Sequence, residues 1–293
     1  MSMRLSSDEL VALVHQVFRP TAEDRALAII VDLPDQRCPD TAGWQVRREI
    51  AAGWAEELAA QHEQTGLQVS LYLYRNVGIN NADLPAEAYL HTGGPLPHAA
   101  EQLQGRETEP FDSIFARHSL LIAPTQLSAT APLKLAARQH RLRAATMPGF
   151  SPSMVPALRL DYGEINRRVG VMKELLDRAE LATLRFLVEG RELRLDLDLR
   201  HRKAHASGGL LPEPGMAGNL PSGEAYIVPH EGEHGASRSE GLLPVQFDDG
   251  LVIYEIKENR AVAATGDNEA ARREAALLQA EPAYGNLAEL GFG

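Results

Sequence analysis

Two glutamates, Glu224 and Glu289, combine a residue type and a setting that could bind metal. Loop-forming residues precede each of them, Gly218-Asn219 before the first and Gly285-Asn286 before the second, and apolar residues follow. Loops that are rich in Gly, Asn and Pro adopt unusual backbone conformations, and such loops often place a functional group. Divalent ions need such oxygen ligands, and two ions about 3.5–4 Å apart can share carboxylates. The residue pattern alone leaves two interpretations open: metal ligands, or glutamates that cap helices or form salt bridges. If both serve one metal site, their oxygens must lie within roughly 4–7 Å of each other.

Two histidine pairs also have a metal-like spacing. The run from His230 to His234 matches the zincin pattern His-Glu-x-x-His, which needs a helix so that both imidazoles reach one zinc. Pro229 precedes this run and Gly232 lies inside it, so we expect a non-helical acidic loop instead. The pair His201 and His205 ends a strand in a basic run and predicts a solvated turn or an edge that faces substrate.

Other catalytic and binding patterns are missing from the sequence. No Gly-x-Ser-x-Gly elbow occurs, and Cys38 is the only cysteine, which argues against serine or cysteine nucleophiles and cysteine-based zinc sites. No Gly-x-Gly-x-x-Gly or Walker-type loop follows a predicted strand, which argues against nucleotide binding. Asp32 follows the first predicted strand, and we expect it to cap or turn the chain; the alternative is a residue that faces a ligand.

Composition narrows the class of partner. The 293 residues are 44% apolar and 24% charged, as in a soluble globular protein, and carry a net charge of −11. An acidic surface disfavours nucleic acid and anionic membranes and suits cationic ligands, including metal ions. The amino terminus has early acidic residues and no secretory signal, and no run approaches the roughly 20 apolar residues of a membrane span. With the single cysteine, these features predict a cytoplasmic protein.

The first half of the chain predicts an open, parallel α/β domain over residues 1–150. Ala26–Val31 is a short, continuous apolar run, typical of a strand buried on both faces, and Leu67–Tyr74 alternates as the next strand. A long amphipathic helix capped by Asp40 or Thr41 lies between them, so the three elements form a right-handed βαβ unit with parallel strands. Further elements are a strand at Ser119–Ala123, a helix after Pro132 and a strand near Leu142–Thr146.

The second half predicts an α+β domain with antiparallel strands over residues 151–293. The Pro-rich stretch Met147–Pro156 is the expected linker. Ala182–Val188 and Glu192–Leu199 alternate around Glu189-Gly190 and so predict a hairpin with one wet face. The fold class is therefore α/β, with an N-terminal parallel domain and a mixed second domain. The remaining predicted elements are a helix after Asp161 and Glu164, strands at Leu243–Phe247, Leu251–Ile256 and Arg260–Ala264, and a helix at Asn268–Gln279 capped by Asp267.

Several motifs in order resemble the thermophilic metallo-aminopeptidase family of aminopeptidase T and aminopeptidase S. The resemblance covers the second half well and the first half only in outline. It rests on the order Gly-Asn-Leu-Pro-x-Gly-Glu and Val-Pro-x-Glu-Gly around Glu224. It rests as well on Met147-Pro148-Gly149, Asp161-Tyr162, the hairpin from Leu181 to Arg200, Asp248-Asp249-Gly250 and Asn286–Gly291.

The resemblance implies a two-metal peptidase site in which Glu224 and Glu289 are ligands. It implies zinc, cobalt or magnesium as cofactor, a peptide or small-molecule substrate, a homodimer and removal of amino-terminal residues from peptides. The same family resemblance extends to an iron-dependent dioxygenase that opens a dihydroxypyridine ring, which would use ferrous iron. A catalytically silent binding protein is the third possibility, and the resemblance names no general base.

One departure from the family pattern sets an expectation about activity. In the family, further carboxylate and histidine ligands, including a closing His-x-Asp, follow the position that matches Glu289, whereas this sequence ends at Gly293. The sequence is then a fragment, or the activity has been lost, or other residues supply the ligands. We therefore expect residues 1–293 to lack aminopeptidase activity, because two glutamates are too few for a catalytic metal site.

Overall fold

The computed structural model describes residues 3–293, which form two compact units. Unit 1 comprises the described residues up to Asn166 together with Ser207–Gly223, and unit 2 comprises Arg167–Ala206 and Glu224–Gly293. The division differs from the contiguous one expected at residue 150, because the segment 207–223 returns to unit 1 and adds a strand to its sheet. None of the helices in residues 3–293 combines the length and apolar character needed to cross a bilayer.

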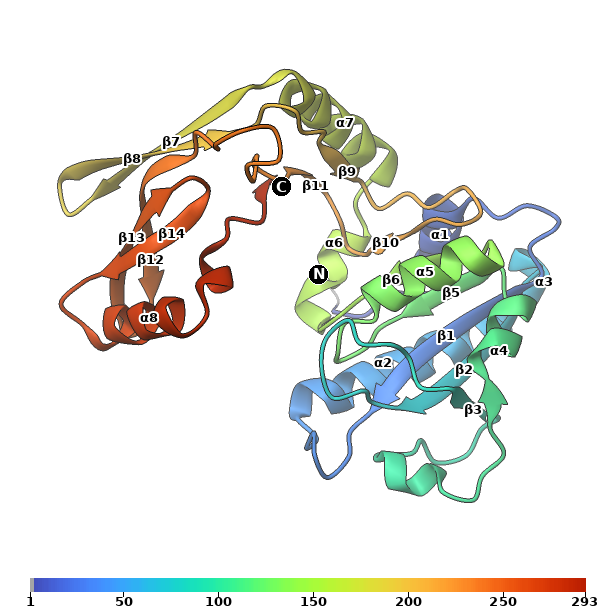
Figure 1. Ribbon diagram of the computed structural model, residues 1–293. Helices are drawn as coiled ribbons and strands as arrows, with labels where there is room; N and C mark the ends of the chain where they lie inside the picture. Colours follow the sequence, from blue (N-terminus) through green and yellow to red (C-terminus); the bar gives the residue numbers. More distant parts are fainter. Residues whose placement is uncertain (1–2) are drawn as a thin grey trace. The chain divides into compact units, whose positions relative to one another are not determined.

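Unit 1 is built on a seven-stranded, mostly parallel sheet, in the order β10-β6-β5-β1-β2-β3-β4 (Figure 1). The predicted βαβ unit is confirmed, since β1 pairs in parallel with β2. Two short strands, β3 and β4, close one edge in antiparallel pairing. The strands are β1 (Ala26–Leu33), β2 (Gln68–Arg75), β3 (Glu87–His91), β4 (Glu109–Pro110), β5 (Leu120–Ala123), β6 (Arg143–Thr146) and β10 (Ala217–Asn219).

Helices cover both faces of this sheet, which explains the continuous apolar run of β1. Leu27, Ile29 and Val31 pack in the core shared with α1 and α2, while Ala28 and Ile30 pack in the core shared with α4 and α5. Ser6 caps α1 and Thr41 caps α2 through side-chain hydrogen bonds. The helices are α1 (Ser7–Phe18), α2 (Ala42–Ala60), α3 (His62–Thr65), η1 (Ala100–Leu103), α4 (Phe111–Arg117), α5 (Thr130–His140), η2 (Pro152–Met154) and α6 (Val155–Leu158).

The helix α7 (Tyr162–Arg178) carries the chain from unit 1 into unit 2. As the sequence predicted, Asp161 precedes it and its side chain accepts a hydrogen bond from the Glu164 N–H, at 3.1 Å. The expected linker, Met147–Pro156, lies wholly within unit 1, where Met147 and Phe150 are buried in the core, and the chain passes into unit 2 after Asn166 instead.

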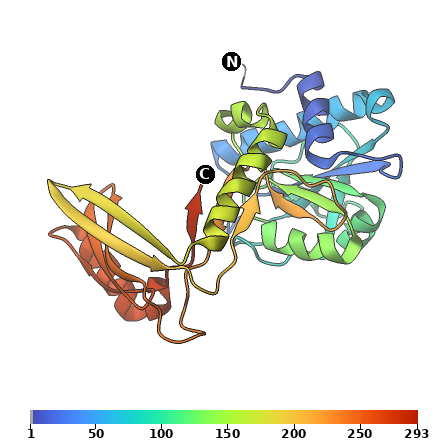
Figure 2. The same ribbon diagram turned by 90° about the horizontal axis from the view of Figure 1, so that it is seen from above.

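Unit 2 holds a five-stranded antiparallel sheet in the order β14-β13-β12-β8-β7, with the β7–β8 hairpin visible as a long ribbon in Figure 2. The predicted alternation is confirmed in β8, where Leu193, Leu195 and Leu197 are buried. The strands are β7 (Leu181–Val188), β8 (Arg191–Asp198), β12 (Glu240–Phe247), β13 (Gly250–Lys257) and β14 (Arg260–Thr265).

The helix α8 (Glu269–Ala280) contacts β13 and β14 and buries Ala270 and Ala271 against Val252. Its cap is Asn268, whose side chain accepts the Ala271 N–H at 2.9 Å, so the expected cap Asp267 was wrong by one residue. The Asn268 amide also donates to the Leu251 carbonyl, which ties the helix start to the sheet. A short 3-10 helix, η3 (Pro282–Gly285), follows α8.

A second, three-stranded sheet in the order β15-β11-β9 completes the described strands. It consists of β9 (His205–Ser207), β11 (Glu224–Ile227) and β15 (Leu290–Phe292). Glu224 is the first residue of β11 and Glu289 immediately precedes β15, so this small sheet carries both glutamates singled out from the sequence.

Candidate functional site

Glu224 and Glu289 lie on one face of the antiparallel pair β11–β15. The register places Tyr226 opposite Gly291 and Ile227 opposite Leu290. Because side chains alternate along a strand, positions 224 and 226 share a face with positions 289 and 291 across the ladder. The two carboxylates therefore flank Gly291, although 65 positions of sequence separate them.

The glycine leaves open the space between the two carboxylates. A Cβ on Gly291 would lie 2.4 Å from Glu224 Oε1 and 3.7 Å from Glu289 Oε1. The two oxygens are thus at most about 6 Å apart, the end-to-end sum of these distances. This separation falls within the range expected for carboxylates that serve one metal site. Any larger residue at position 291 would occupy the position of the Glu224 carboxylate.

Neither carboxylate has a polar partner among the residues that the structure describes. Glu224 is half-buried and Glu289 is exposed. Within residues 3–293, neither side chain makes an ion pair or a hydrogen bond. Carboxylates with no partner retain their full capacity to bind a cation.

Two aromatic side chains lie beside the glutamates. Burial, followed by the negative charges of Glu289 and Glu224, raises the pKa of Tyr226 above its usual value, so its hydroxyl stays protonated near neutral pH. The ring of His205 on β9 stacks on Tyr226, with centroids 5.1 Å apart and planes 23° apart. His205 is exposed at the start of β9 and His201 is exposed in the turn after β8, so the two histidines do not end one strand as the sequence suggested.

The donor set fits a divalent metal ion in chemistry but supplies only two ligands. Carboxylate oxygens suit magnesium and also bind zinc and ferrous iron. Among residues 3–293, no group of three or more His, Cys, Asp or Glu residues is arranged to hold an ion. A metal at Glu224 and Glu289 would therefore need ligands besides those that the described residues bring together.

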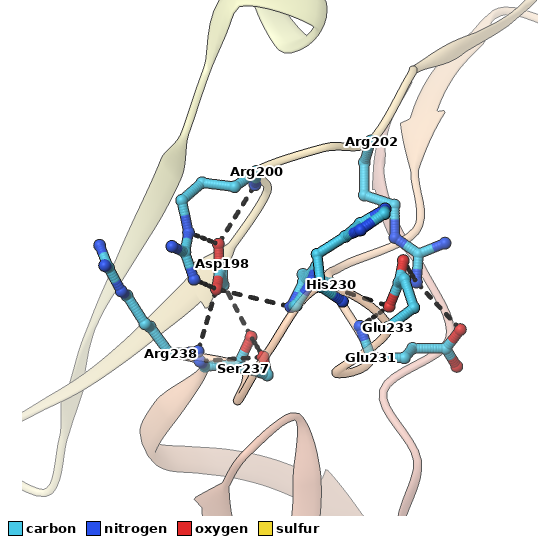
Figure 3. Close-up of polar contacts among 10 residues, drawn as sticks. Asp198, Arg200, Arg202, His230, Glu231, Glu233, Ser237 and Arg238 are labelled. Atoms are coloured by element: carbon cyan, nitrogen blue, oxygen red, sulfur yellow. Dashed lines mark hydrogen bonds and ion pairs between the residues drawn. The ribbon is translucent and has the colours of Figure 1, made fainter.

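The motif from His230 to His234 is a loop, as predicted, and not a zincin helix. It is anchored on Asp198, at the end of β8, which is 1% exposed (Figure 3). Arg200 donates to this carboxylate from Nε at 2.8 Å and from Nη2 at 2.6 Å, and the Arg238 N–H donates at 3.0 Å. These contacts, the Arg200 guanidinium first, hold the pKa of Asp198 far below its usual range.

His230 is fully buried beside Asp198 and closes the loop on itself. Its N–H donates to the Asp198 carbonyl at 2.8 Å, and its Nε2 accepts the His234 N–H at 3.3 Å. Its Nδ1 lies 3.8 Å from Asp198 Oδ2 and makes no hydrogen bond within the described residues. The rings of His201 and His234 lie 4.9 Å apart by centroid, near His230, without forming a set of metal ligands.

Two acidic side chains of this loop pair with one arginine. Arg202 Nη2 lies 3.1 Å from Glu231 Oε2 and 2.8 Å from Glu233 Oε1 (Figure 3). The other oxygen of Glu231 accepts a hydrogen bond from the Asn286 amide at 2.7 Å. The loop is thus linked to the segment that leads into Glu289.

In unit 1, Asp32 lies inside β1 and does not cap or turn the chain as the sequence predicted. It is 1% exposed and accepts the N–H groups of Gln126 and Leu127 at 2.7 and 2.9 Å. The indole of Trp44 also donates to it, at 3.2 Å. Burial is the largest effect on this carboxyl and raises its pKa. Asp32 therefore ties the loop after β5 to the end of β1.

The sequence marked Asn286 and Gly291 only as parts of a motif, and it assigned no role at the site to them, to Tyr226 or to Asp198. A signal existed for Gly291 and Tyr226, because alternation along Glu224–Ile227 and Glu289–Phe292 places them on the face of the glutamates once the strands are paired. No local signal marks Asp198, whose partners come from positions 200, 230 and 238.

The sequence matches no family model and no curated protein. Two solved structures are similar to the fold. One is 2,5-dihydroxypyridine dioxygenase from Pseudomonas putida KT2440, with TM-score 0.63 and 15% identity over 99% of this chain and 77% of that one. The other is AmpT from Thermus thermophilus, with TM-score 0.53 and 12% identity over 98% of this chain and 77% of that one. At these identities the likeness shows the fold alone: this chain has the α/β architecture that the dioxygenase and AmpT share.

Proposed function

We propose that this chain carries the metal site of an aminopeptidase-type, metal-dependent hydrolase, with Glu224 and Glu289 as metal ligands. The observation that carries the proposal is the convergence of these two unpartnered carboxylates on Gly291. The fold shared with AmpT supports the choice of reaction class. A peptide substrate carries a cationic ammonium group at its amino terminus, and the negative charge of the two glutamates would attract this group.

Two residues of the site would bind the metal, and three others would determine the shape of the space around it. Glu224 and Glu289 would hold zinc, cobalt or magnesium, and the bound ion supplies activation of a water as nucleophile. Gly291 keeps the space between the carboxylates free of side-chain atoms. The stacked rings of Tyr226 and His205 lie beside the two carboxylates, and the protonated Tyr226 hydroxyl can donate a hydrogen bond.

A ring-opening dioxygenase that uses ferrous iron is the second candidate. Two observations favour it: the dioxygenase has the higher TM-score of the two similar structures, and a stacked Tyr226–His205 pair suits a planar aromatic substrate. Both candidates use the same two carboxylates. A silent binding protein is the third candidate, favoured by the absence of a three-ligand group among residues 3–293.

Metal titration tests the ligand assignment. Dialysed protein is titrated with Zn²⁺, Co²⁺, Mg²⁺ and, without oxygen, Fe²⁺ in a calorimeter. We expect one binding event that is lost in E224Q and in E289Q and kept in E192Q, since Glu192 lies on the β7–β8 hairpin and pairs with Arg185. Binding that survives both site substitutions would remove the basis of the proposal.

Ligand binding to the metal-loaded protein separates the two reactions. A leucine hydroxamate presents a free amine and a metal-binding group and should bind the zinc or cobalt form if the site is of the aminopeptidase type. Selective binding of 2,5-dihydroxypyridine to the ferrous form would favour the dioxygenase. Because the described residues bring only two carboxylates together, we expect binding without turnover by residues 1–293. Turnover would show that further ligands come from within the chain, with His201, His205, His230 and His234 the first to substitute.

The cytoplasmic location and the homodimer stay predictions.

A further inference from the structure

The segment from Asn286 to Glu289 is held in place before it reaches the candidate metal site. Asn259 is fully buried and brackets Leu287: its carbonyl accepts the Leu287 N–H at 3.0 Å, and its amide donates to the Leu287 carbonyl at 2.9 Å. The neighbouring side chain, Asn286, is fixed from the loop, because its amide donates to Glu231 at 2.7 Å. In the part of the chain that the structure describes, the Glu289 side chain has no such contact, so its position depends on the backbone on both sides: the preceding segment held at Asn286 and Leu287, and β15, which pairs with β11.

The loop that carries Glu231 is rigid at its base. His230 is fully buried and bonded through its backbone N–H to Asp198, and the loop closes through the His234 N–H. The Glu231 N–H also donates to Glu233 Oε2 at 3.0 Å. Arg202 binds Glu231 Oε2, which fixes the orientation of the carboxylate, and Oε1 then accepts the hydrogen bond from Asn286.

We propose that Glu231 is a positioning residue which, through its hydrogen bond to Asn286, fixes the backbone that presents Glu289 to the metal. The inference rests on the proposed function, because it assigns Glu289 as a ligand. It gives the His-Glu-x-x-His motif a role other than zinc binding. Glu231 of this loop contacts Asn286, which precedes the proposed ligand Glu289 by three positions in the sequence. Groups that orient metal ligands affect affinity without touching the ion.

A positioning role predicts an effect on the site with little effect on the fold. The Glu231 side chain is 43% exposed and its partner Arg202 keeps a second ion pair with Glu233. Exposed pairs contribute little to global stability. Loss of the hydrogen bond should therefore weaken metal binding while the melting temperature stays within about 2 °C of the wild type.

A set of variants separates the hydrogen bond from the charge. E231A removes both and should weaken metal affinity about three- to tenfold. E231Q keeps an oxygen that accepts from Asn286 and should stay within about twofold of the wild type. N286D places two carboxylates against each other and should bind metal most weakly of the single variants. In the double variant E231Q/N286D, the new amide can donate to the new carboxylate, which should restore most of the affinity. E192A, which removes an exposed glutamate on the β7–β8 hairpin, is the charge control.

Hydrogen exchange gives a readout that does not depend on metal. Amides of residues 287–291 should exchange faster in E231A and N286D than in the wild type and E192A, and at the wild-type rate in the double variant. Equal exchange and equal metal affinity in E231A and E192A would overturn the inference. If the wild type binds no metal at Glu224 and Glu289, the proposed function fails, and the exchange rates alone then decide whether the loop holds this segment.

Discussion

Two acidic regions of unit 2 use their carboxylates in opposite ways. Asp198 is buried and surrounded by donors from Arg200 and Arg238, whereas Glu224 and Glu289 reach a common space without any protein partner. A saturated carboxylate contributes to folding and has no lone pairs left for a ligand. Unpartnered carboxylates of like charge in proximity add nothing to folding. The difference indicates that Asp198 stabilises the fold, whereas Glu224 and Glu289 are available to bind a cation.

Asp32 of unit 1 extends the comparison. It is as buried as Asp198, but its donors are backbone and indole N–H groups. Burial accordingly raises the pKa of Asp32, whereas the Arg200 guanidinium lowers that of Asp198. The guanidinium that donates directly to Asp198 outweighs burial there, whereas at Asp32 burial outweighs the N–H donors and the nearby charge of Arg47.

The largest expected effect comes from removing the unpartnered pair. In E224Q/E289Q, metal binding should be undetectable by calorimetry, while the fold is unchanged, since neither carboxylate has a structural partner within residues 3–293. Circular dichroism and thermal melting check the fold. A large fall in melting temperature would show that the pair is structural and would weaken the comparison.

Substitution of Asp198 should have the opposite outcome. D198A removes the acceptor of the Arg200 and Arg238 groups and should reduce the free energy of unfolding by about 2–4 kcal/mol. Urea unfolding measures the change. D196A, on the same strand but with its carboxylate paired to Arg194 at the surface, should cost less than about 1 kcal/mol. Equal losses in the two variants would contradict the special role of the buried site.

The same carboxylate predicts a dependence of stability on pH. Because its folded-state pKa is lowered, Asp198 contributes stability that is fully present above its unfolded pKa of about 3.9 and is lost as the pH falls toward the folded pKa. The melting temperature of the wild type should thus fall more steeply below about pH 4 than that of D198N. Parallel curves for the two proteins would show that Asp198 does not carry this dependence.

The smallest effect is expected from Gly291. In G291A, the new Cβ would displace the Glu224 carboxylate, which lies 2.4 Å from its position, so metal affinity should fall roughly tenfold with little loss of stability. Gly53 in α2 has open space around it, and G53A is the matched control. Unchanged affinity in G291A would show that Glu224 binds from another rotamer.

The parts of the fold that could be predicted from sequence are those with a local pattern. The buried run of β1, the alternation of β8 and the glycine within His230–His234 each determine local structure, and each prediction was confirmed. The short strands β9 and β10 have three residues each, too few for a period, and their pairing depends on distant partners. The burial of Asp198 also depends on residues 30–40 positions away, so no window of sequence reveals it.

The return of the segment 207–223 to unit 1 has a consequence for protein synthesis. The last strand of that sheet, β10, pairs with β6 across some 70 intervening residues, among them the whole β7–β8 hairpin. A nascent chain that has left the ribosome only as far as the hairpin still exposes the open edge of β6, a surface prone to pairing with other strands. Completion of the first unit must therefore wait until part of the second has been translated, and ribosome pausing before residue 217 should prolong this vulnerable stage.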